Sequence, residues 1–373
     1  MSRIKLLVMT VLLACLLLAL PTLAESAAKV EVLGQSVPAD TETLSLDNIP
    51  LGDAGALIVG LDQLKQVKSV SLVGSGLSLK DMTALRMAFP AIQFNWTLDI
   101  YKQTVSSEDT FVDLQKQKVE DFEEFKAFLN DFPNLTKVDM YNTFLKRDII
   151  DQMAVNYPQI EFGWTIRIAE HRIRTDQTAF STLHSRDSKK HTGEDFRQLK
   201  YCKNMLSLDI GHNNATDISF LTDMPQLKVL ILADNNLEDI SVLAKLPNLE
   251  YIELLKNKVT DITPLAGLTN LLDLNLCFNY IDNLMPLYGL KKLERLWLYN
   301  SNNWKEKDPV PKDEVAAVQA ALPNCYIDST SYSTLGGWRR HPRYYVIFNT
   351  FKRGEYIPWD DESVQPKYPQ PFK

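Results

Sequence analysis

Sequence motifs for catalysis are missing from this chain of 373 residues. It has no glycine-rich nucleotide loop, no G-x-S-x-G, no H-E-x-x-H and no pair of cysteines at zinc-ligand spacing. The five histidines are scattered, and His184 and His191 bracket a basic loop, where surface residues are expected rather than metal ligands. The sequence therefore predicts no catalytic residue, no cofactor and no metal site.

Positive charge and long hydrophobic runs are scarce as well. The formal net charge is −7, which argues against a nucleic-acid partner. After residue 24, no run approaches the ~20 apolar residues that a membrane-spanning helix needs. Residues 1–24 have a basic start, an apolar middle and a small-residue cleavage site at Ala24, so they are expected to be a signal peptide. A lipoprotein anchored at Cys15 and an uncleaved N-terminal anchor stay open as alternatives.

Cysteine is also rare, with four residues in the whole chain. Cys202 and Cys325 fall at core positions of the repeats described next, and Cys277 lies among strand positions expected to face outward. Stacked turns lie ~4.8 Å apart, so the roughly five turns between Cys202 and Cys325 exceed the ~7 Å that a disulfide can span. We expect no disulfide bonds.

What the chain does contain is a repeat of 22 residues, from Met205 to about Asn303. Six apolar registers recur in four copies and most of a fifth, which is the L-x-x-L-x-L-x-x-N-x-L pattern of a leucine-rich repeat. Residues two apart on a strand point to the same face, so each copy directs its aliphatic side chains into one shared core. The polar register of the repeat holds Asn213, Asn235, Asn257, Asn279 and then Ser301.

The asparagines are expected to be buried and to satisfy backbone groups after each strand, because an amide side chain both donates and accepts hydrogen bonds. The alternative is that they only form turns. The second half of each copy is short, as in Asp261 to Pro264, and predicts 3₁₀ or irregular turns on the outer face.

Residues 205–303, with copies such as LKVLILADNNLEDISVLAKLPN, resemble the internalin-like class of bacterial leucine-rich repeats. The resemblance implies a secreted or surface-attached binding protein that has no catalytic activity of its own.

A second repeat, of 68 residues, lies upstream. FPAIQFNWTLDI at 89–100 matches YPQIEFGWTIRI at 157–168. We expect helices over 80–88, 119–132 and 147–156, and hairpins or simple coils over 96–105 and 164–174. Strands are expected to start near 44, 70, 94, 112, 138, 162, 181 and 208, so the solenoid should begin near residue 40.

The C-terminal part should contain a helix over 314–322 and a strand over 323–327. Segments 343–348 and 354–358 are expected to pair as a hairpin, and residues 330–373 to cap the last core layer. The expected fold is thus an α/β leucine-rich repeat solenoid with a parallel concave sheet. It has four parts: a signal peptide (1–24), irregular strand–helix repeats (25–204), regular repeats (205–303), and a terminal repeat, cap and tail (304–373).

Binding is expected on the concave face, where exposed aromatic side chains next to charges would form a recognition patch. The candidate binding residues are His212, Asp234, Tyr251, Glu253, Lys256, Asp273, Phe278, Arg295, Trp297 and Tyr299. A competing interpretation is that the cap folds back over Trp297 and Tyr299, while Tyr251 and Phe278 are less affected. The expected partner is a protein or peptide. Two alternatives are a glycan stacked on the aromatic rings, and an enzyme in the irregular flanks with Asp360 and Asp361 as the nearest acids.

Overall fold

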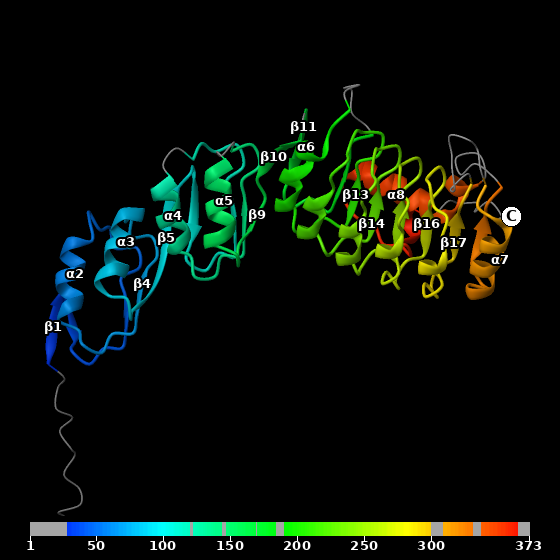
Figure 1. Cartoon of the computed structure of the whole chain (residues 1–373). Helices are drawn as coiled ribbons and strands as arrows, with labels where there is room; N and C mark the ends of the chain where they lie inside the picture. Colours follow the sequence, from blue (N-terminus) through cyan, green and yellow to red (C-terminus); the bar gives the residue numbers. More distant parts are fainter. Residues whose placement is uncertain are drawn as a thin grey trace, which may run out of the picture. The chain divides into compact units, whose positions relative to one another are not determined.

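A computed structural model of the chain describes residues 28–119, 122–143, 147–168, 170–183, 190–299, 309–330 and 337–364. The chain forms two compact units (Figure 1). The first unit comprises residues up to 110 together with 121–135, and the second comprises 111–120 together with 136 onward. No boundary between compact units falls at residue 204, where the irregular repeats were expected to give way to the regular ones.

In the first unit, two hairpins flank a short parallel sheet. The strands of this unit are β1 (Lys29–Val32), β2 (Gln35–Pro38), β3 (Thr43–Ser45), β4 (Ser69–Leu72), β5 (Gln93–Ile100) and β6 (Gln103–Ser106). Its helices are α2 (Gly55–Asp62), α3 (Leu79–Ala88) and α4 (Phe122–Asn130). β3, β4 and β5 are parallel, and β5 turns back into β6. The expected hairpin after Trp96 is confirmed, and Trp96 packs edge-on against Phe132 at a centroid distance of 4.8 Å.

The second unit begins with the same order of elements. Three parallel strands, β7 (Phe111–Asp113), β8 (Lys137–Asp139) and β9 (Glu161–Phe162), are followed by a hairpin of β10 (Thr165–Ile168) and β11 (His171–Arg174). Helix α5 (Arg147–Asn156) connects β8 to β9. The 68-residue repeat of the sequence is therefore a repeat of structure. Within the described residues, the parallel strands from residue 40 onward fall into three separate sheets, containing β3–β5, β7–β9 and the strands from β12 onward, rather than into one continuous sheet.

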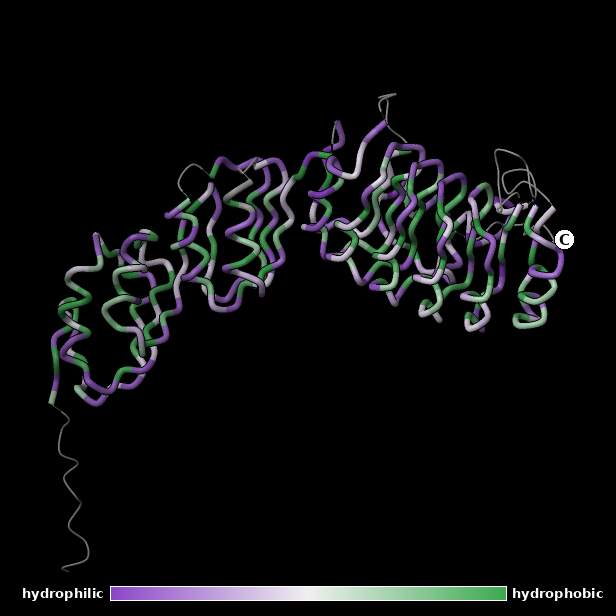
Figure 2. Tube along the Cα trace, in the orientation of Figure 1, coloured by the Kyte–Doolittle hydropathy of each residue, from purple (hydrophilic) through white to green (hydrophobic). Residues whose placement is uncertain are grey.

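The regular repeats form a seven-stranded parallel sheet in the described residues. Its strands are β12 (Ala179–Ser181), β13 (Ser207–Asp209), β14 (Val229–Ile231), β15 (Tyr251–Glu253), β16 (Asp273–Asn275), β17 (Arg295–Trp297) and β18 (Tyr326–Asp328). From β13 to β17 each residue pairs with the one 22 positions later, as Leu230 does with Ile252. Figure 2 shows hydrophobic stretches recurring from turn to turn along these coils.

The chain returns between these strands through short helices, as expected. They are α6 (Gly193–Phe196), η1 (Arg197–Tyr201), η2 (Ser219–Asp223), η3 (Ser241–Lys245), η4 (Thr263–Leu265), η5 (Met285–Leu287) and α7 (Lys312–Ala321). Those from η1 to η5 are 3₁₀ helices, because a 22-residue period leaves room for only one or two turns.

The asparagine register is buried and fully hydrogen-bonded, which confirms the expected ladder. Asn257 is typical: its Nδ2 donates to the carbonyl of Leu254 at 3.0 Å in its own turn and to that of Leu232 at 2.9 Å in the preceding turn. Its Oδ1 accepts the backbone N–H of Leu237 at 3.1 Å. Each amide thus ties two successive turns together. Asn235 and Asn279 follow the same scheme, whereas Asn213 donates to the hydroxyl of Thr182 at 3.0 Å in place of a backbone carbonyl of the preceding turn.

The C-terminal segment differs from the expectation. Residues 342–353 form helix α8 (Pro342–Arg353) instead of a hairpin strand. The aromatic and branched run at 343–348 favours a strand locally. Helix signals override it: His341 caps the first turn, Pro342 occupies the first helical position, and Gly354 ends the helix at φ 72°. α8 contacts β12 and β13, and η6 (Trp338–Arg340) precedes it. In Figure 1, α8 lies behind β13 and the strands that follow it.

Residues 1–24, with the expected signal peptide, lie outside the described residues. Among those described, no helix is long and apolar enough to cross a membrane. Cys202, Cys277 and Cys325 are buried, and no disulfide joins them. Cys277 lies with the side chains of the concave face, as expected, but it is buried there in one cluster with Trp297 and with Trp338 of the C-terminal segment.

Candidate functional site

The concave face of the seven-stranded sheet is occupied by the chain's own C-terminal segment. The ring of Trp338 lies 5.1 Å from that of Trp297 and 5.4 Å from that of Tyr251. All three side chains have at most 1% of their surface exposed. Further along, the backbone N–H of Ala179 donates to the carbonyl of Gly354 at 3.3 Å. The segment therefore follows the face from β17 back to β12.

A buried charge cluster fixes this segment to the sheet. Asp273 is fully buried and receives hydrogen bonds from Arg295 on the neighbouring strand and from Arg343 on α8, both at 2.5 Å from the guanidinium Nε. Burial alone would raise the pKa of Asp273, but the charges and hydrogen bonds of the two arginines outweigh it and lower the pKa below its ordinary value. The carboxylate stays ionised between its two partners.

A second buried carboxylate, that of Glu253, lies on the neighbouring strand β15, two residues after the residue that pairs with Asp273. Glu253 accepts a hydrogen bond from Trp338 Nε1 at 2.9 Å and another from the hydroxyl of Tyr251. Burial raises the pKa of Glu253, although these hydrogen bonds oppose the shift. Acids and bases do converge under the segment, but they bond to one another and are closed to solvent.

The structure divides the ten candidate residues into two groups of five. Tyr251, Glu253, Asp273, Arg295 and Trp297 are buried beneath the C-terminal segment. The expectation that Tyr251 remains clear of that segment is wrong, and the competing interpretation is right for Trp297. The cause is the path of α8, which no local pattern reveals. His212, Asp234, Lys256, Phe278 and Tyr299 remain partly or largely exposed.

These five residues form what we call the strand-end column, because each lies just after a strand of the sheet. His212 Nδ1 lies 3.0 Å from Asp234 Oδ2, and Lys256 Nζ lies 2.8 Å from Asp234 Oδ1. Phe278 and Tyr299 meet edge-to-face with centroids 5.4 Å apart. Over five successive turns the side chains of the column therefore change from charged or polar at His212 to aromatic at Tyr299.

The backbone of the column is strained. His212, Asp234, Lys256 and Phe278 all have φ between 53° and 59°, the left-handed region that glycine tolerates best. A non-glycine residue costs roughly 1–2 kcal/mol there. The chain nevertheless carries a side chain at each of these four positions.

The geometry gives little support to the two alternative functions, glycan binding and an enzyme in the irregular flanks. A glycan platform needs exposed ring faces, and two of the four candidate aromatic residues, Tyr251 and Trp297, are buried. Asp361, one of the two acids named for an enzyme, accepts the backbone N–H of Ser363 at 2.9 Å. The hydrogen bonds from Ser363 lower its pKa, as in a turn-capping carboxylate.

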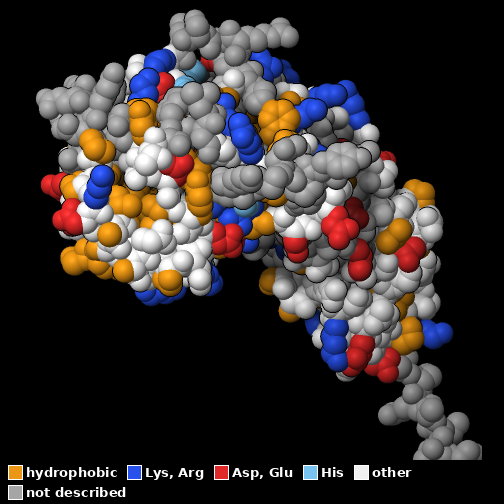
Figure 3. Space-filling model, turned by 90° about the vertical axis from the view of Figure 1, so that its right-hand side faces the viewer, with side chains coloured by type: hydrophobic (Ala, Val, Ile, Leu, Met, Phe, Trp, Pro, Cys, Tyr) orange, Lys and Arg blue, Asp and Glu red, His pale blue; other side chains and the backbone are white. Residues whose placement is uncertain are grey.

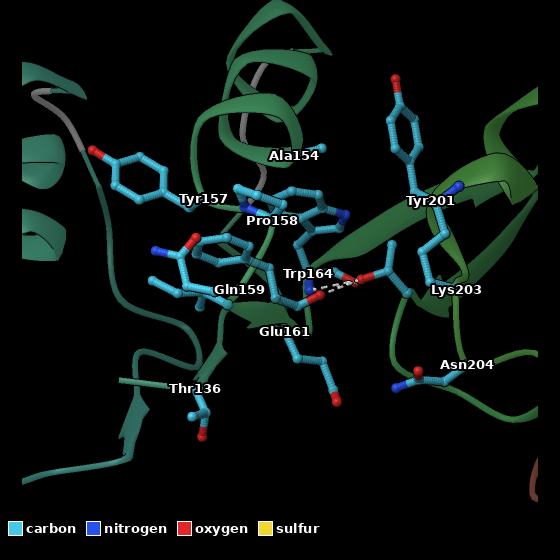
Figure 4. A pocket seen from close by; sticks show the side chains of 13 residues that line it. Thr136, Ala154, Tyr157, Pro158, Gln159, Glu161, Trp164, Tyr201, Lys203 and Asn204 are labelled. Carbon is cyan, nitrogen blue, oxygen red and sulfur yellow. Dashed lines mark hydrogen bonds between the residues drawn. The ribbon is translucent and has the colours of Figure 1, made fainter. Parts of the chain in front are cut away.

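A pocket that the sequence did not reveal lies between β9 and the segment after η1 (Figure 4). Its volume is about 490 Å³. Phe162 and Trp164 stack 5.2 Å apart on its wall, with Tyr201 edge-on to Trp164, and Lys203 and Asn204 add polar groups. The indole N–H of Trp164 is buried without a hydrogen-bond partner. The motif YPQIEFGW, noted in the sequence only as a repeat, supplies most of this wall.

Hydrophobic side chains are also exposed elsewhere. Met285 on η5 and Tyr345 and Phe348 on α8 are 41–63% exposed. Figure 3 shows hydrophobic side chains lying among charged ones on the face toward the viewer. Single exposed apolar residues of this kind are common on protein surfaces.

The expectation of surface histidines is wrong for His191, which is only 5% exposed. His184 lies outside the described residues. His191 is instead brought next to Glu170 and His171 of the β10–β11 hairpin.

Comparison with known proteins agrees with the repeat architecture. Residues 225–267 match the family described as Leucine Rich repeats (2 copies). No curated protein matches the chain.

Solved structures similar to this chain include leucine-rich repeat proteins of bacteria. Internalin C2 of Listeria monocytogenes is 24% identical over 42% of this chain and 74% of its own, with a TM-score of 0.31. Internalin F of the same species is 16% identical over 79% and 83%, with a TM-score of 0.31. A leucine-rich repeat protein of Leptospira interrogans is 17% identical over 78% and 96%, with a TM-score of 0.29. At such scores these structures carry no argument about function.

Proposed function

We propose that this protein is a non-catalytic binding protein, acting outside the cell or at its surface, that recognises a protein partner through the strand-end column. Leucine-rich repeats are typically scaffolds for protein binding. The proposed location rests on the signal-peptide pattern of residues 1–24.

The observation that carries the proposal is the retention of side chains at strained backbone positions. Glycine would relieve the backbone at 212, 234, 256 and 278, yet the column holds a histidine, two charged residues and a phenylalanine. Two of them, His212 and Lys256, have about half of their side-chain surface exposed. Charged groups beside an aromatic pair supply both the polar contacts and the hydrophobic anchor that protein interfaces use.

The buried half of the concave face is not part of the proposed surface. The C-terminal segment already fills it with tryptophan and arginine anchors. A partner that used Tyr251 or Trp297 would first have to displace that segment.

Glycine substitutions give a sharp test, because they remove the side chain and suit the backbone. Lys256→Gly and Phe278→Gly are introduced together, and Met285→Ala, at an exposed position on η5, is the matched control. Partners are captured from the native extracellular medium with wild-type and both variants and are identified by mass spectrometry. The dissociation constant of each is then measured with the purified partner.

The proposal predicts that the double variant stays folded at the assay temperature and binds at least 10-fold more weakly than wild-type, while Met285→Ala binds as wild-type does. The loss of Phe278, which packs against the buried cluster, should lower the melting temperature of the double variant, so circular dichroism checks its fold before binding is compared. Equal affinity of wild-type and the double variant for every captured partner would contradict the proposal that the strand-end column is the binding surface.

A further inference from the structure

A cluster of two histidines and one glutamate lies at the start of the regular repeats, away from the strand-end column. Glu170 and His171 come from the tip of the β10–β11 hairpin, and His191 comes from the turn before α6. One ligand-type atom from each residue lies within 4.8 Å of the other two. Figure 1 shows β10 and β11 beside α6.

His191 takes a position that is apolar in each of the three turns that follow it. Its backbone N–H donates to Asn213 Oδ1 at 2.9 Å, and its carbonyl accepts the N–H of Asn214 at 2.8 Å. In the following turns the residues with these same two bonds are Ala215, Leu237 and Val259. All three are 0% exposed. A titratable ring therefore replaces an aliphatic side chain at a fixed backbone position of the coil.

The distances within the cluster suit a metal ion. His171 Nε2 lies 3.4 Å from Glu170 Oε1, and His191 Nε2 lies 3.6 Å from Glu170 Oε2. Ligands about 2.0 Å from a tetrahedral zinc ion are about 3.3 Å from one another. The three ligand-type atoms all lie within 4.8 Å of one another, so binding of one ion requires side-chain rotations that bring the widest pair closer together.

The rings are also held in place. His171 meets Phe180 edge-on at a centroid distance of 5.4 Å, and His191 meets Phe196 edge-on at 6.1 Å. An aromatic shell of this kind limits water access and fixes ligand orientation. The Glu170 side chain is 35% exposed, which leaves one side of the cluster open to solvent.

We infer that Glu170, His171 and His191 form a binding site for a divalent transition-metal ion, with Zn²⁺ as the best match. Two imidazoles and one carboxylate favour Zn²⁺ over Ca²⁺ or Mg²⁺, which prefer oxygen ligands. The three protein ligands leave the fourth tetrahedral position for water or for a ligand from a partner. The ion would also connect the β10–β11 hairpin to the first turn of the seven-stranded sheet.

The test uses the full chain without a polyhistidine tag, treated with a chelator and then dialysed. Zn²⁺ is titrated calorimetrically, and Co²⁺ is added separately to read coordination from its visible absorption. The variants are His191→Leu, which copies the aliphatic residue of a later turn, and His171→Ala, at a less buried position. His212→Ala, an exposed histidine of the strand-end column, is the control.

Wild-type and His212→Ala are expected to bind one Zn²⁺ per chain, to give the absorption of tetrahedral Co²⁺, and to melt at a higher temperature with Zn²⁺. Both cluster variants should bind at least 10-fold more weakly, and His191→Leu should fold at least as stably as metal-free wild-type. The inference is overturned if wild-type shows no saturable one-to-one binding, or if His171→Ala and His191→Leu keep wild-type affinity. His171→Ala decides the question by itself if His191→Leu does not fold.

Discussion

Arg343 reaches across 70 residues of sequence to form two hydrogen bonds with Asp273, from Nε at 2.5 Å and from Nη2 at 2.9 Å. This bidentate pair joins α8 to the middle of the seven-stranded sheet. It also explains why the concave face is closed: a buried carboxylate on β16 needs cationic partners, and α8 supplies one of them.

Removing that arginine should loosen the C-terminal segment. Arg343→Ala leaves Asp273 with Arg295 alone and is expected to lower the free energy of unfolding by about 3 kcal/mol, as for other broken buried ion pairs. The measurement is urea denaturation followed by tryptophan fluorescence, since Trp338 and Trp297 lie in the same cluster. Arg340→Ala, at an exposed position on η6, is the control and should have little effect. An equal loss in both variants would contradict the role given to the pair.

The asparagine ladder predicts a strong contrast between two residues of one type. Asn257→Ala removes an amide that bonds to two successive turns and leaves buried backbone groups unsatisfied, so it should cost ~1–3 kcal/mol. Asn248 donates to the carbonyl of Pro225 at 3.0 Å but is exposed, so Asn248→Ala should cost well under ~1 kcal/mol. Chemical denaturation of the two variants measures both values. Similar losses would mean that burial of the ladder does not matter.

Asp209 predicts a pH dependence of stability. Burial raises its pKa to about 6, although Gly211 and Ser181 donate hydrogen bonds to it. The folded state therefore holds the proton more tightly than the unfolded state, so the contribution of Asp209 to the free energy of unfolding should rise as pH falls from about 7 toward 4. In Asp209→Asn the amide oxygen can accept the N–H of Gly211 and the amide nitrogen can donate to the Ser181 hydroxyl, without the charge. It should be about 1–3 kcal/mol more stable than wild-type at pH 7.5, with the difference disappearing near pH 4.

Thermal or urea unfolding at several pH values provides this measurement. Asp282→Asn, which replaces an exposed carboxylate, is the control. A lower stability of Asp209→Asn at pH 7.5 would show that the buried charge is compensated in the folded protein.

His341 predicts the opposite pH dependence. Burial and the nearby charges of Arg295 and Arg343 lower its pKa to about 3, and its Nδ1 accepts the N–H of Arg343 at the start of α8. The folded state keeps the ring neutral, so this contribution to stability is present above pH 6.5 and is lost as pH falls toward 3.

Asparagine can accept the same N–H without titrating. Between pH 7.5 and 5.5, His341→Asn should therefore lose about 1 kcal/mol less of its unfolding free energy than wild-type. Parallel urea titrations at the two pH values give the difference. If the two proteins lost equal stability, His341 would not be the titrating group.

The repeating parts of this protein follow from its amino-acid sequence. The 22-residue registers predicted the strands, the 3₁₀ or irregular returns and the buried asparagines. The 68-residue repeat predicted α3 and α5, and it left hairpins and simple coils as alternatives for the two segments that are hairpins. These features depend on residues that are close in sequence, or on one pattern copied at a fixed interval. They can therefore be predicted from short stretches of sequence, because every copy packs against its neighbour through the same residue types.

The covering of the repeats, in contrast, depends on contacts between distant parts of the chain. Tyr251 and Trp297 occupy positions that a leucine-rich repeat would leave open, and they are buried because Trp338 and Arg343, far away in sequence, find partners there. His191 and Glu170 likewise meet through the fold of a hairpin. Such contacts join parts of the chain that share no periodicity. Their free energy depends on which surfaces meet after the coil has formed, which no single segment specifies.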